Sequence, residues 1–358
     1  MYFPMPSEPT ALRRPTLHKI ADLVRAGLVA PEDLAGLERV AETYSVALTP
    51  AVLDLIDPTD AADPIARQYV PHVAELSTGT EELSDPIGDA AYSPVKGIVH
   101  RYPDRVLLTP LLVCPVYCRF CFRRARVGDA EASLTEAELD AALAYVAGRP
   151  EVREVILTGG DPLMLPPRRL QSLIGRIAAL DQIELIRIHS RIPVSDPGRV
   201  SSALVAALKP ADEADVAVWL AVHVNHPREL SPLARGALAR LADAGLPLLS
   251  QTVLLKDVND SVEILDQLMR ALVRNRVRPY YLHHPDLAPG TAHFRPSLAE
   301  GRALMAALRG RLSGIAQPTY VLDIPGGAGK VPVGPEYWDE NRGEITDPGG
   351  RIHPYPGD

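Results

Sequence analysis

The feature that most constrains the fold is a regular alternation of apolar runs and amphipathic segments. Strand-like apolar runs cover residues 106–113, 154–158, 183–188, 216–222, 247–255 and 278–283. Segments with apolar residues at helical spacing follow them at 135–148, 167–180, 197–208, 229–244, 261–274 and 297–311. Strands and helices that alternate in this way form parallel sheets, because each helix returns the chain to the edge where the next strand starts. The sequence therefore predicts an α/β fold of six strand–helix units, curved into an open partial barrel.

Segments of a different character flank this repeat. Residues 15–57 carry apolar side chains at helical spacing, interrupted by Pro31 and Pro50, and a polar stretch follows to about residue 89. A seventh apolar run, TYVLDI, leads into a glycine loop and a tail rich in proline and glycine. The 358 residues suffice for one large barrel with additions. We expect a helical extension at 1–90, the barrel at 91–324 and a C-terminal segment at 325–358.

Charge and composition exclude several classes of protein. The net charge of −8 provides no overall basic field for nucleic acid. No apolar run approaches the roughly 18 residues that span a bilayer, and the first residues lack the apolar core of a signal peptide. The three cysteines make an odd, clustered set that fits a reducing compartment rather than a disulfide framework. We therefore expect a cytoplasmic protein that acts on neither membrane nor nucleic acid.

All three cysteines lie in one short segment, as Cys114, Cys118 and Cys121. They follow the first predicted strand, at the end where parallel barrels carry their reactive groups. Thiolate is the soft ligand that iron–sulfur clusters need. Ferredoxin runs use four cysteines, so three would leave one iron of a [4Fe–4S] cube open to a small molecule. The alternatives are a chance grouping or a zinc site that lacks its fourth ligand.

A pair of glycines follows the second predicted strand, in the segment VILTGGDPL. Gly159 and Gly160 would let a ligand approach the backbone closely, and Asp161 can accept a hydrogen bond from an ammonium group. The alternative is an ordinary turn between a strand and a helix.

Lys330 stands at the end of the glycine-rich segment DIPGGAGK. Small residues allow a planar cofactor to lie against the backbone, and a lysine amine can form a Schiff base with an aldehyde such as pyridoxal 5′-phosphate (PLP). Val331 follows the lysine, where a nucleoside-triphosphate loop has serine or threonine. The alternative is a solvated lysine on a surface loop.

Taken in this order, the cysteine loop, the glycine pair and the lysine loop resemble the lysine 2,3-aminomutase family of radical S-adenosylmethionine (SAM) enzymes. The likeness runs from about residue 85 to 337 and includes HRYPDRV, CRFCFRR, LTGGDPL, SRIPV, HVNHP and SQTVLLKDVND. It implies an open (β/α)6 barrel of radical SAM type, with a [4Fe–4S] cluster, SAM and PLP as cofactors. The implied reaction is an isomerisation that moves the α-amino group of L-lysine to the β-carbon. Its implied partners are an amino-acid substrate, a flavodoxin or ferredoxin as electron donor, and further copies of the chain in a homo-oligomer.

The resemblance also assigns roles to residues by matching position. Lys330 would bind PLP, Arg123 would pair with the substrate α-carboxylate, and Asp286 and Asp323 would hold the ε-ammonium of lysine. Glutamate-acting relatives lack this acidic pair, so its presence favours lysine. The cluster would be held by Cys114, Cys118 and Cys121, and the cofactors would contact Arg101, Tyr102, Gly159, Gly160, Asp161, Arg191, His223 and Gln251.

Three positions depart from the pattern of well-studied members, and one of them is Phe120, which stands between the second and third cysteines where those members have histidine. His283 and His284 stand where tyrosine and glutamine are common, which changes the expected shape of the cavity. An aminomutase that acts on a different amino acid therefore stays open as an alternative. Two further alternatives are a radical SAM enzyme that is not a mutase and a non-catalytic iron–sulfur protein.

Overall fold

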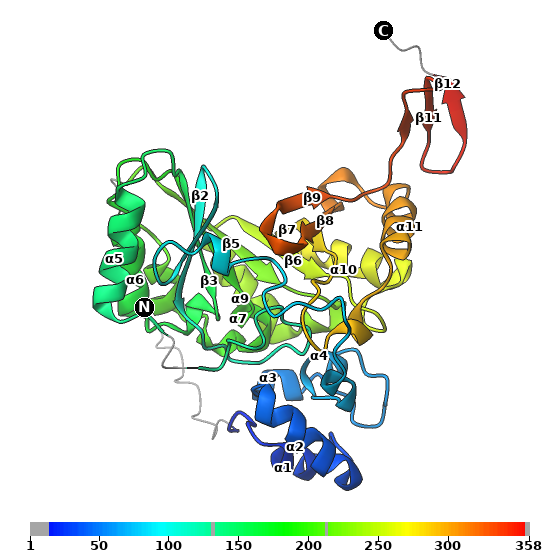
Figure 1. Cartoon of the computed structure of the whole chain (residues 1–358), viewed down its shortest axis with the longest axis horizontal. Helices are drawn as coiled ribbons and strands as arrows, with labels where there is room; N and C mark the ends of the chain where they lie inside the picture. Colours follow the sequence, from blue (N-terminus) through cyan, green and yellow to red (C-terminus); the bar gives the residue numbers. More distant parts are fainter. Residues whose placement is uncertain (1–13, 130–132, 212–213, 355–358) are drawn as a thin grey trace, which may run out of the picture.

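The computed structural model describes residues 14–129, 133–211 and 214–354. Its body is a nine-stranded sheet in which the strands follow one another in sequence order, with helices packed outside it (Figure 1). The central strands β2 to β8 are parallel, and β1 and β9 are antiparallel at the two edges. The strands are β1 (Ile98–Tyr102), β2 (Arg105–Leu111), β3 (Glu154–Gly159), β4 (Leu185–Ser190), β5 (Ala217–His223), β6 (Leu248–Val253), β7 (Val277–His283), β8 (Thr319–Ile324) and β9 (Gly329–Pro332).

Five of the helices that connect the parallel strands begin at side-chain caps that the sequence supplies. Thr135 and Ser297 each accept from the third backbone N–H of their helix, and Glu138 and Glu300 complete a capping box. The connecting helices are α5 (Glu136–Ala147), α6 (Pro167–Ala178), α7 (Ile192–Ser195), α8 (Ser202–Ala207), α9 (Pro232–Asp243), α10 (Val262–Arg274) and α11 (Leu298–Arg309). The five with side-chain caps are α5, α8, α9, α10 and α11. Their apolar faces and the strands form one continuous buried core.

The predicted series of six strand–helix units is confirmed, with two differences. The helix expected at 197–208 is a 3-10 turn, Pro197–Arg199, followed by the short α8, because Ser201 caps a new helix through the N–H of Leu204. The seventh apolar run is also a parallel strand, β8, so the parallel part of the sheet has seven strands.

Lys330 lies on a strand, so the expectation that it stands in a loop is wrong. After Ile324 the chain turns through Pro325–Gly327, and Gly326 and Gly327 have φ values of 79° and 87°. Side chains other than glycine rarely adopt this backbone region, so the glycines serve to reverse the chain. β9 then pairs antiparallel with β8, and Lys330 is directly opposite Asp323.

Short helices lie N-terminal to the barrel, where the proline positions predicted them. They are α1 (Ile20–Arg25), α2 (Leu34–Thr43), α3 (Pro50–Leu53) and α4 (Ala66–Tyr69). Their buried side chains form a second apolar cluster, which also includes Val116 of the cysteine loop. The N-terminal segment thus packs against the loop that carries the cysteines. The division of the chain into three domains stays a prediction.

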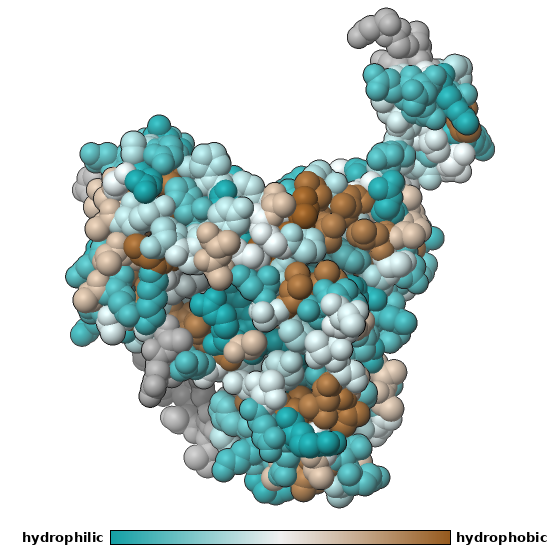
Figure 2. Space-filling model, in the orientation of Figure 1, coloured by the Kyte–Doolittle hydropathy of each residue, from teal (hydrophilic) through white to brown (hydrophobic). Residues whose placement is uncertain are grey.

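Three short strands follow the barrel near the C-terminus: β10 (Trp338–Asp339), β11 (Glu344–Thr346) and β12 (Ile352–Pro354). They form a separate antiparallel sheet that stands away from the body (Figure 1). Figure 2 shows that the visible face of this small sheet is mostly hydrophilic. Within residues 14–129, 133–211 and 214–354, none of the helices combines the length and the apolar character that a membrane span needs.

Candidate active site

A cavity of about 730 Å³ lies inside the partial barrel and is lined from β1 to β9. This volume is typical of sites for small molecules and cofactors. Residues at the carboxyl ends of the parallel strands, such as Thr158, Ser190 and His223, form part of its wall. All fifteen site residues predicted from the sequence line this one cavity. The fold therefore brings together the cysteine loop, the glycine pair and the lysine hairpin, which are far apart in the chain. The lysine hairpin is the antiparallel pair of β8 and β9, and Lys330 lies on β9.

The cysteine loop, residues 114–121, forms a hydrogen bond with a buried arginine. The Arg191 guanidinium donates to Cys118 Sγ at 2.8 Å. It also donates to Gln68 Oε1 at 2.6 Å and to Glu229 Oε2 at 2.7 Å. Arg191 was expected on the rim that faces SAM and PLP. It does line the cavity, and its polar contacts also fix the loop against the N-terminal segment.

The thiols of the cysteine loop are in an environment that does not favour thiolate without a cation. Burial, together with the nearby Cys118, raises the pKa of Cys121 to about 11. Burial and the carboxylate of Asp161 raise the pKa of Cys114 well above its usual value. Bound iron would supply the positive charge that converts such thiols into ligands.

The arrangement of the thiols suits a cluster better than a single ion. Among the residues that the structure describes, no three histidine, cysteine, aspartate or glutamate side chains converge closely enough to bind one metal ion. In a [4Fe–4S] cube each thiolate binds a different iron, so cluster cysteines surround the cube rather than meet at one point. Three cysteines around one cavity meet that requirement.

The glycine pair at the end of β3 lines the cavity and also lies close to a neighbouring segment of backbone. A Cβ on Gly160 would lie 2.4 Å from the Val113 carbonyl oxygen, and a Cβ on Gly159 would lie 2.7 Å from the Leu111 oxygen. The close approach is therefore to the backbone that leads into the cysteine loop. Asp161 is also engaged by the protein.

The Asp161 carboxylate accepts from the hydroxyl of Ser190 at 2.8 Å and from the backbone N–H groups of Arg191, Ile192 and Leu163 at 2.7, 3.1 and 3.1 Å. These four donors saturate it, because a carboxylate has about four acceptor positions. Asp161 is thus held by the protein itself while it lines the cavity, and its contact with an ammonium group stays a prediction.

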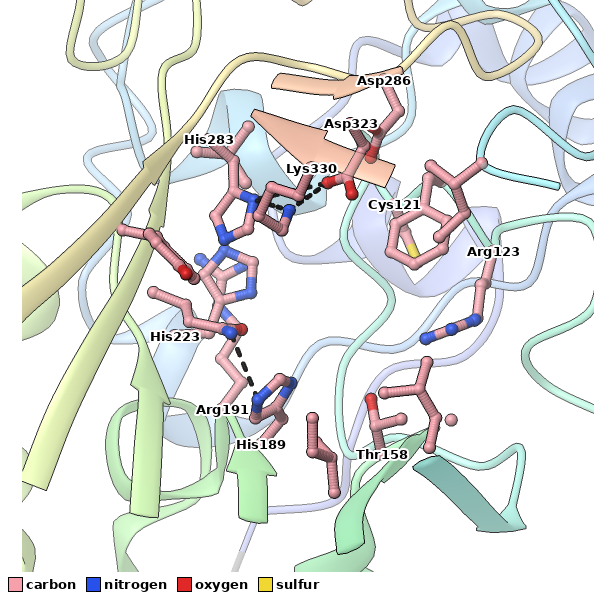
Figure 3. A pocket seen from close by; sticks show the side chains of 18 of the residues that line it. Cys121, Arg123, Thr158, His189, Arg191, His223, His283, Asp286, Asp323 and Lys330 are labelled. Carbon is pink, nitrogen blue, oxygen red and sulfur yellow. Dashed lines mark hydrogen bonds and ion pairs between the residues drawn. The ribbon is translucent and has the colours of Figure 1, made fainter. Parts of the chain in front are cut away.

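Lys330 points into the cavity between an acid and a base (Figure 3). Its Nζ forms an ion pair with the Asp323 carboxylate and lies 3.2 Å from His283 Nδ1. Its backbone N–H donates to the Tyr102 hydroxyl at 2.7 Å, which links β9 to β1 across the open side of the sheet.

Two of the cavity aspartates, Asp323 and Asp286, differ in their charge state. Burial opposes the charged form of Asp323, but His283 and Lys330 outweigh burial and lower the pKa of Asp323 to about 2. Burial and the negative charge of Asp323 raise the pKa of Asp286 to about 7. Asp286 Oδ1 is buried without a hydrogen-bond partner. This acidic corner therefore has an acceptor that a cationic ligand would satisfy.

Asp89 joins two of the predicted arginines and was missed by the sequence analysis. Its carboxylate accepts from Arg123 at 2.7 Å and from Arg101 at 3.3 Å. Arg101 also donates to the Ile87 carbonyl oxygen, and its Nε is buried without a partner. The unpaired Nε fits an anionic group such as a phosphate. Asp89 lies at the start of the resemblance, in SDPIGD, and that position is the one signal that could have revealed it.

Two histidines on the cavity wall are neutral. His223 Nε2 lies 3.1 Å from Asn225 Oδ1, and His189 Nε2 lies 3.2 Å from the Gln251 amide. Burial lowers the pKa of both histidines well below the usual value, assisted by Arg191 for His223 and by Arg187 for His189. His189 was missed by the sequence analysis. Buried and partly buried side chains alternate along β4, and this alternation places His189 on the face that points away from the core and into the cavity.

The fold and the cysteine loop define a radical SAM protein, and comparison with known families agrees. Residues 108–268 match the family model described as "Radical SAM superfamily", and residues 305–343 match one described as "Lysine-2,3-aminomutase". The chain is 42% identical to an L-lysine 2,3-aminomutase of Fusobacterium nucleatum, over 90% of this chain and 75% of that protein.

Two further relatives extend this comparison. An L-lysine 2,3-aminomutase of Acetoanaerobium sticklandii is 41% identical over 90% of this chain and 77% of that protein. A glutamate 2,3-aminomutase of Clostridioides difficile is 33% identical over 90% of this chain and 74% of that protein. The chain belongs to the lysine 2,3-aminomutase family.

Proposed function

We propose that this protein converts L-lysine to β-lysine by moving the α-amino group to the β-carbon, with a [4Fe–4S] cluster, SAM and PLP as cofactors. One observation carries the proposal: a single cavity holds the three cysteines, the lysine hairpin and an acidic corner with an unsatisfied carboxylate oxygen. The relatives named L-lysine 2,3-aminomutase support the same reaction.

The residues present fit the three cofactors. Cys114, Cys118 and Cys121 would hold the cluster, and the unpaired Nε of Arg101 would meet the PLP phosphate beside Lys330. When bound, the cluster and SAM supply a carbon-centred radical, and PLP supplies a conjugated carrier for the migrating nitrogen.

The chain itself would bind and orient the substrate from two sides. Arg123 lies across the cavity from Lys330 and offers a planar fork to the α-carboxylate, in exchange for its present partner Asp89 (Figure 3). Asp286 and Asp323 would hold the ε-ammonium, whose positive charge favours ionisation of Asp286. Binding at both ends would fix which β-hydrogen faces the radical source.

Several uncharged wall residues would also shape the site. The neutral rings of His223 and His189, with Gln251 and Tyr102, would contact the cofactors. Gly159 and Gly160 would keep the β3 end close to the cysteine loop, and SAM would lie beside them. We further propose a cytoplasmic location, a flavodoxin or ferredoxin as reductant, a homo-oligomeric state and the three-domain division.

The role of Lys330 is tested by replacing it with alanine. Wild-type protein mixed with PLP should show the absorbance change of a lysine–aldehyde linkage, and hydride reduction should add the mass of PLP to the peptide that contains Lys330. K330A should lose both signals, because no other amine is held at that position. An unchanged absorbance and mass in K330A would contradict the assignment.

The alternative to L-lysine is a different amino-acid substrate. The observation that favours this alternative is His283, which departs from the family pattern and lies beside the acidic corner. Anaerobic assays with the reconstituted protein, SAM, PLP and a reductant should compare L-lysine with glutamate and with neutral amino acids. We expect L-lysine to give the highest kcat/KM, since its terminal ammonium meets two carboxylates. A higher kcat/KM for another amino acid would show that this amino acid, and not L-lysine, is the substrate.

A further inference from the structure

His283 is the one departure from the family pattern that touches the lysine at the centre of the site. It ends β7, and its Nδ1 lies 3.2 Å from Lys330 Nζ (Figure 3). The Asp323 carboxylate forms an ion pair with the same Nζ and lies 3.9 Å from His283 Nδ1. The side chains of His283, Lys330 and Asp323 are 19%, 23% and 13% exposed, so bulk water reaches them poorly.

Lys330 Nζ must lose a proton before it can react with the aldehyde of PLP. Only a neutral amine can add to an aldehyde, whereas a lysine amine is protonated near neutral pH. In this cavity Nζ also forms an ion pair with the Asp323 carboxylate. Capture therefore needs a group that removes one proton from Nζ inside a poorly hydrated cavity.

The groups that face His283 come from several strands. His189 on β4 and His223 on β5 are hydrogen-bonded to Gln251 and Asn225, and Tyr281 on β7 places its ring centroid 5.6 Å from that of His283. Asp286 also contributes charge to this corner. Among the side chains that the structure describes, Nζ forms hydrogen bonds with Asp323 and His283. Asp323 is a weak base, because its pKa is about 2.

We propose that His283 Nδ1 accepts the proton of the Lys330 ammonium and so prepares this lysine for PLP; the inference rests on the proposed function. One Nζ–H bond breaks and one Nδ1–H bond forms, which moves the positive charge onto the imidazole. The amine lone pair then adds to the aldehyde carbon, and the carbonyl oxygen leaves as water when the carbon–nitrogen double bond forms. The imidazolium remains beside the Asp323 carboxylate, so the ion pair persists with a new cation.

The electrostatics of the cavity support this transfer. Burial and the positive charge of Lys330 lower the pKa of His283 to about 4, so the imidazole is neutral and its lone pair is available. When Lys330 gives up its proton, the charge that depressed the pKa of His283 is lost, while Asp323 continues to favour the protonated ring. His283 thus becomes a stronger base as the proton leaves the lysine.

The test measures PLP capture by protein that carries neither cluster nor SAM. The rate is followed by absorbance and confirmed by the mass added to the Lys330 peptide after hydride reduction, from pH 6 to pH 10. H283N should slow capture by about tenfold or more at pH 7, since a positioned base contributes about 10²-fold or more. The deficit should shrink toward pH 10, where hydroxide removes the proton instead. H100N is the matched control, because His100 contacts Tyr145 and lies outside the cavity.

A second variant, H283A, distinguishes loss of the base from structural damage to the site. In H283A, added imidazole should restore capture, whereas pyrrole, a ring of similar size without a basic nitrogen, should not. Capture by H283N at the wild-type rate, or a deficit that is the same at every pH, would overturn the inference. Failure of the wild-type protein to capture PLP on Lys330 would instead overturn the proposed function, and the inference with it.

Discussion

At the scale of single residues, the acidic corner shows how neighbours set the charge of two like groups. Asp323 is ionised because Lys330 and His283 lie against it, while Asp286 has no partner at Oδ1 and is buried next to another negative charge. Two carboxylates so placed are costly to ionise together unless a cation joins them. The ligand-free protein therefore carries an electrostatic cost that a diammonium substrate would relieve.

Asp286 gives a prediction about stability and pH. A carboxyl with a raised pKa stabilises the folded chain below its unfolded pKa, and that contribution is lost as the pH rises through the folded value. For Asp286 the loss falls between about pH 4 and pH 7, since its pKa moves from 3.8 to about 7. D286N should therefore exceed the ligand-free wild type in free energy of unfolding by about 1–3 kcal/mol at pH 8, with a much smaller difference near pH 4.5.

Urea unfolding at the two pH values provides the measurement for D286N. The control is D243N, because Asp243 forms an exposed pair with Arg276. A difference between D286N and wild type that does not change with pH would show that the Asp286 carboxyl is not the titrating group.

At the scale of elements, the end of β3 and the start of the cysteine loop are packed backbone against backbone. The N–H of Gly160 donates to the Leu111 carbonyl at 2.8 Å, and the N–H of Asp161 donates to the Val113 carbonyl at 3.0 Å. Val113 immediately precedes Cys114, so the position of the first thiol depends on Gly160, a residue without a side chain that directly follows β3. Packing between these two elements thus fixes the position of Cys114, which the spacing of the cysteines in the sequence does not determine.

G160A tests this dependence. The new Cβ would lie 2.4 Å from the Val113 oxygen and 2.6 Å from its nitrogen, so the backbone must shift. We expect a loss of about 1–3 kcal/mol in stability, the usual cost of overpacking, and less iron bound after anaerobic reconstitution. G175A is the control, since a Cβ there meets no atom within 4 Å and alanine favours α6. Iron content equal to wild type in G160A would argue against the role of this contact.

At the scale of the whole molecule, the sheet is held closed by contacts between its first and last strands. The Tyr102 hydroxyl on β1 accepts from the backbone of Lys330 on β9 at 2.7 Å. Gly88 lies against Gly326, where a Cβ on Gly88 would be 2.6 Å from the Gly326 carbonyl carbon. The open side of the barrel therefore carries the lysine, and its position depends on residues more than two hundred positions earlier.

Y102F should weaken this junction. It removes one hydrogen bond, which costs about 0.5–1.5 kcal/mol of stability, and frees the Lys330 backbone to move. We expect a lower thermal midpoint and faster loss of PLP on dilution. Y145F removes a comparable hydrogen bond to His100 away from the cavity and should lose stability without faster PLP loss. Equal PLP retention in Y102F and wild type would show that the junction does not hold the lysine.

The parallel strands of the barrel were predictable because apolar runs and helical patterns recur over long stretches. β1 and β9 were not, since each is short and lies next to proline or glycine, and their partners β2 and β8 reveal them only in the folded chain. Hairpin geometry, not local propensity, makes Lys330 a strand residue.

The candidate site was predictable where residue types are rare and motifs are long, as for the cysteines and Lys330. The resemblance could place Asp161, Arg123 and Arg191 near the cavity but could not show their protein partners. Those partners, such as Asp89, come from loops whose positions depend on tertiary packing.

The placement of the two ends of the sheet has a consequence for the order of events during translation. Cys121 and Lys330 are separated by 209 positions (330 − 121). At about 5–20 residues per second, the lysine emerges roughly 10–40 s after the last thiol. For that interval the nascent chain exposes its three thiols without the strand that carries the lysine, so the sulfur ligands become accessible before the amine does.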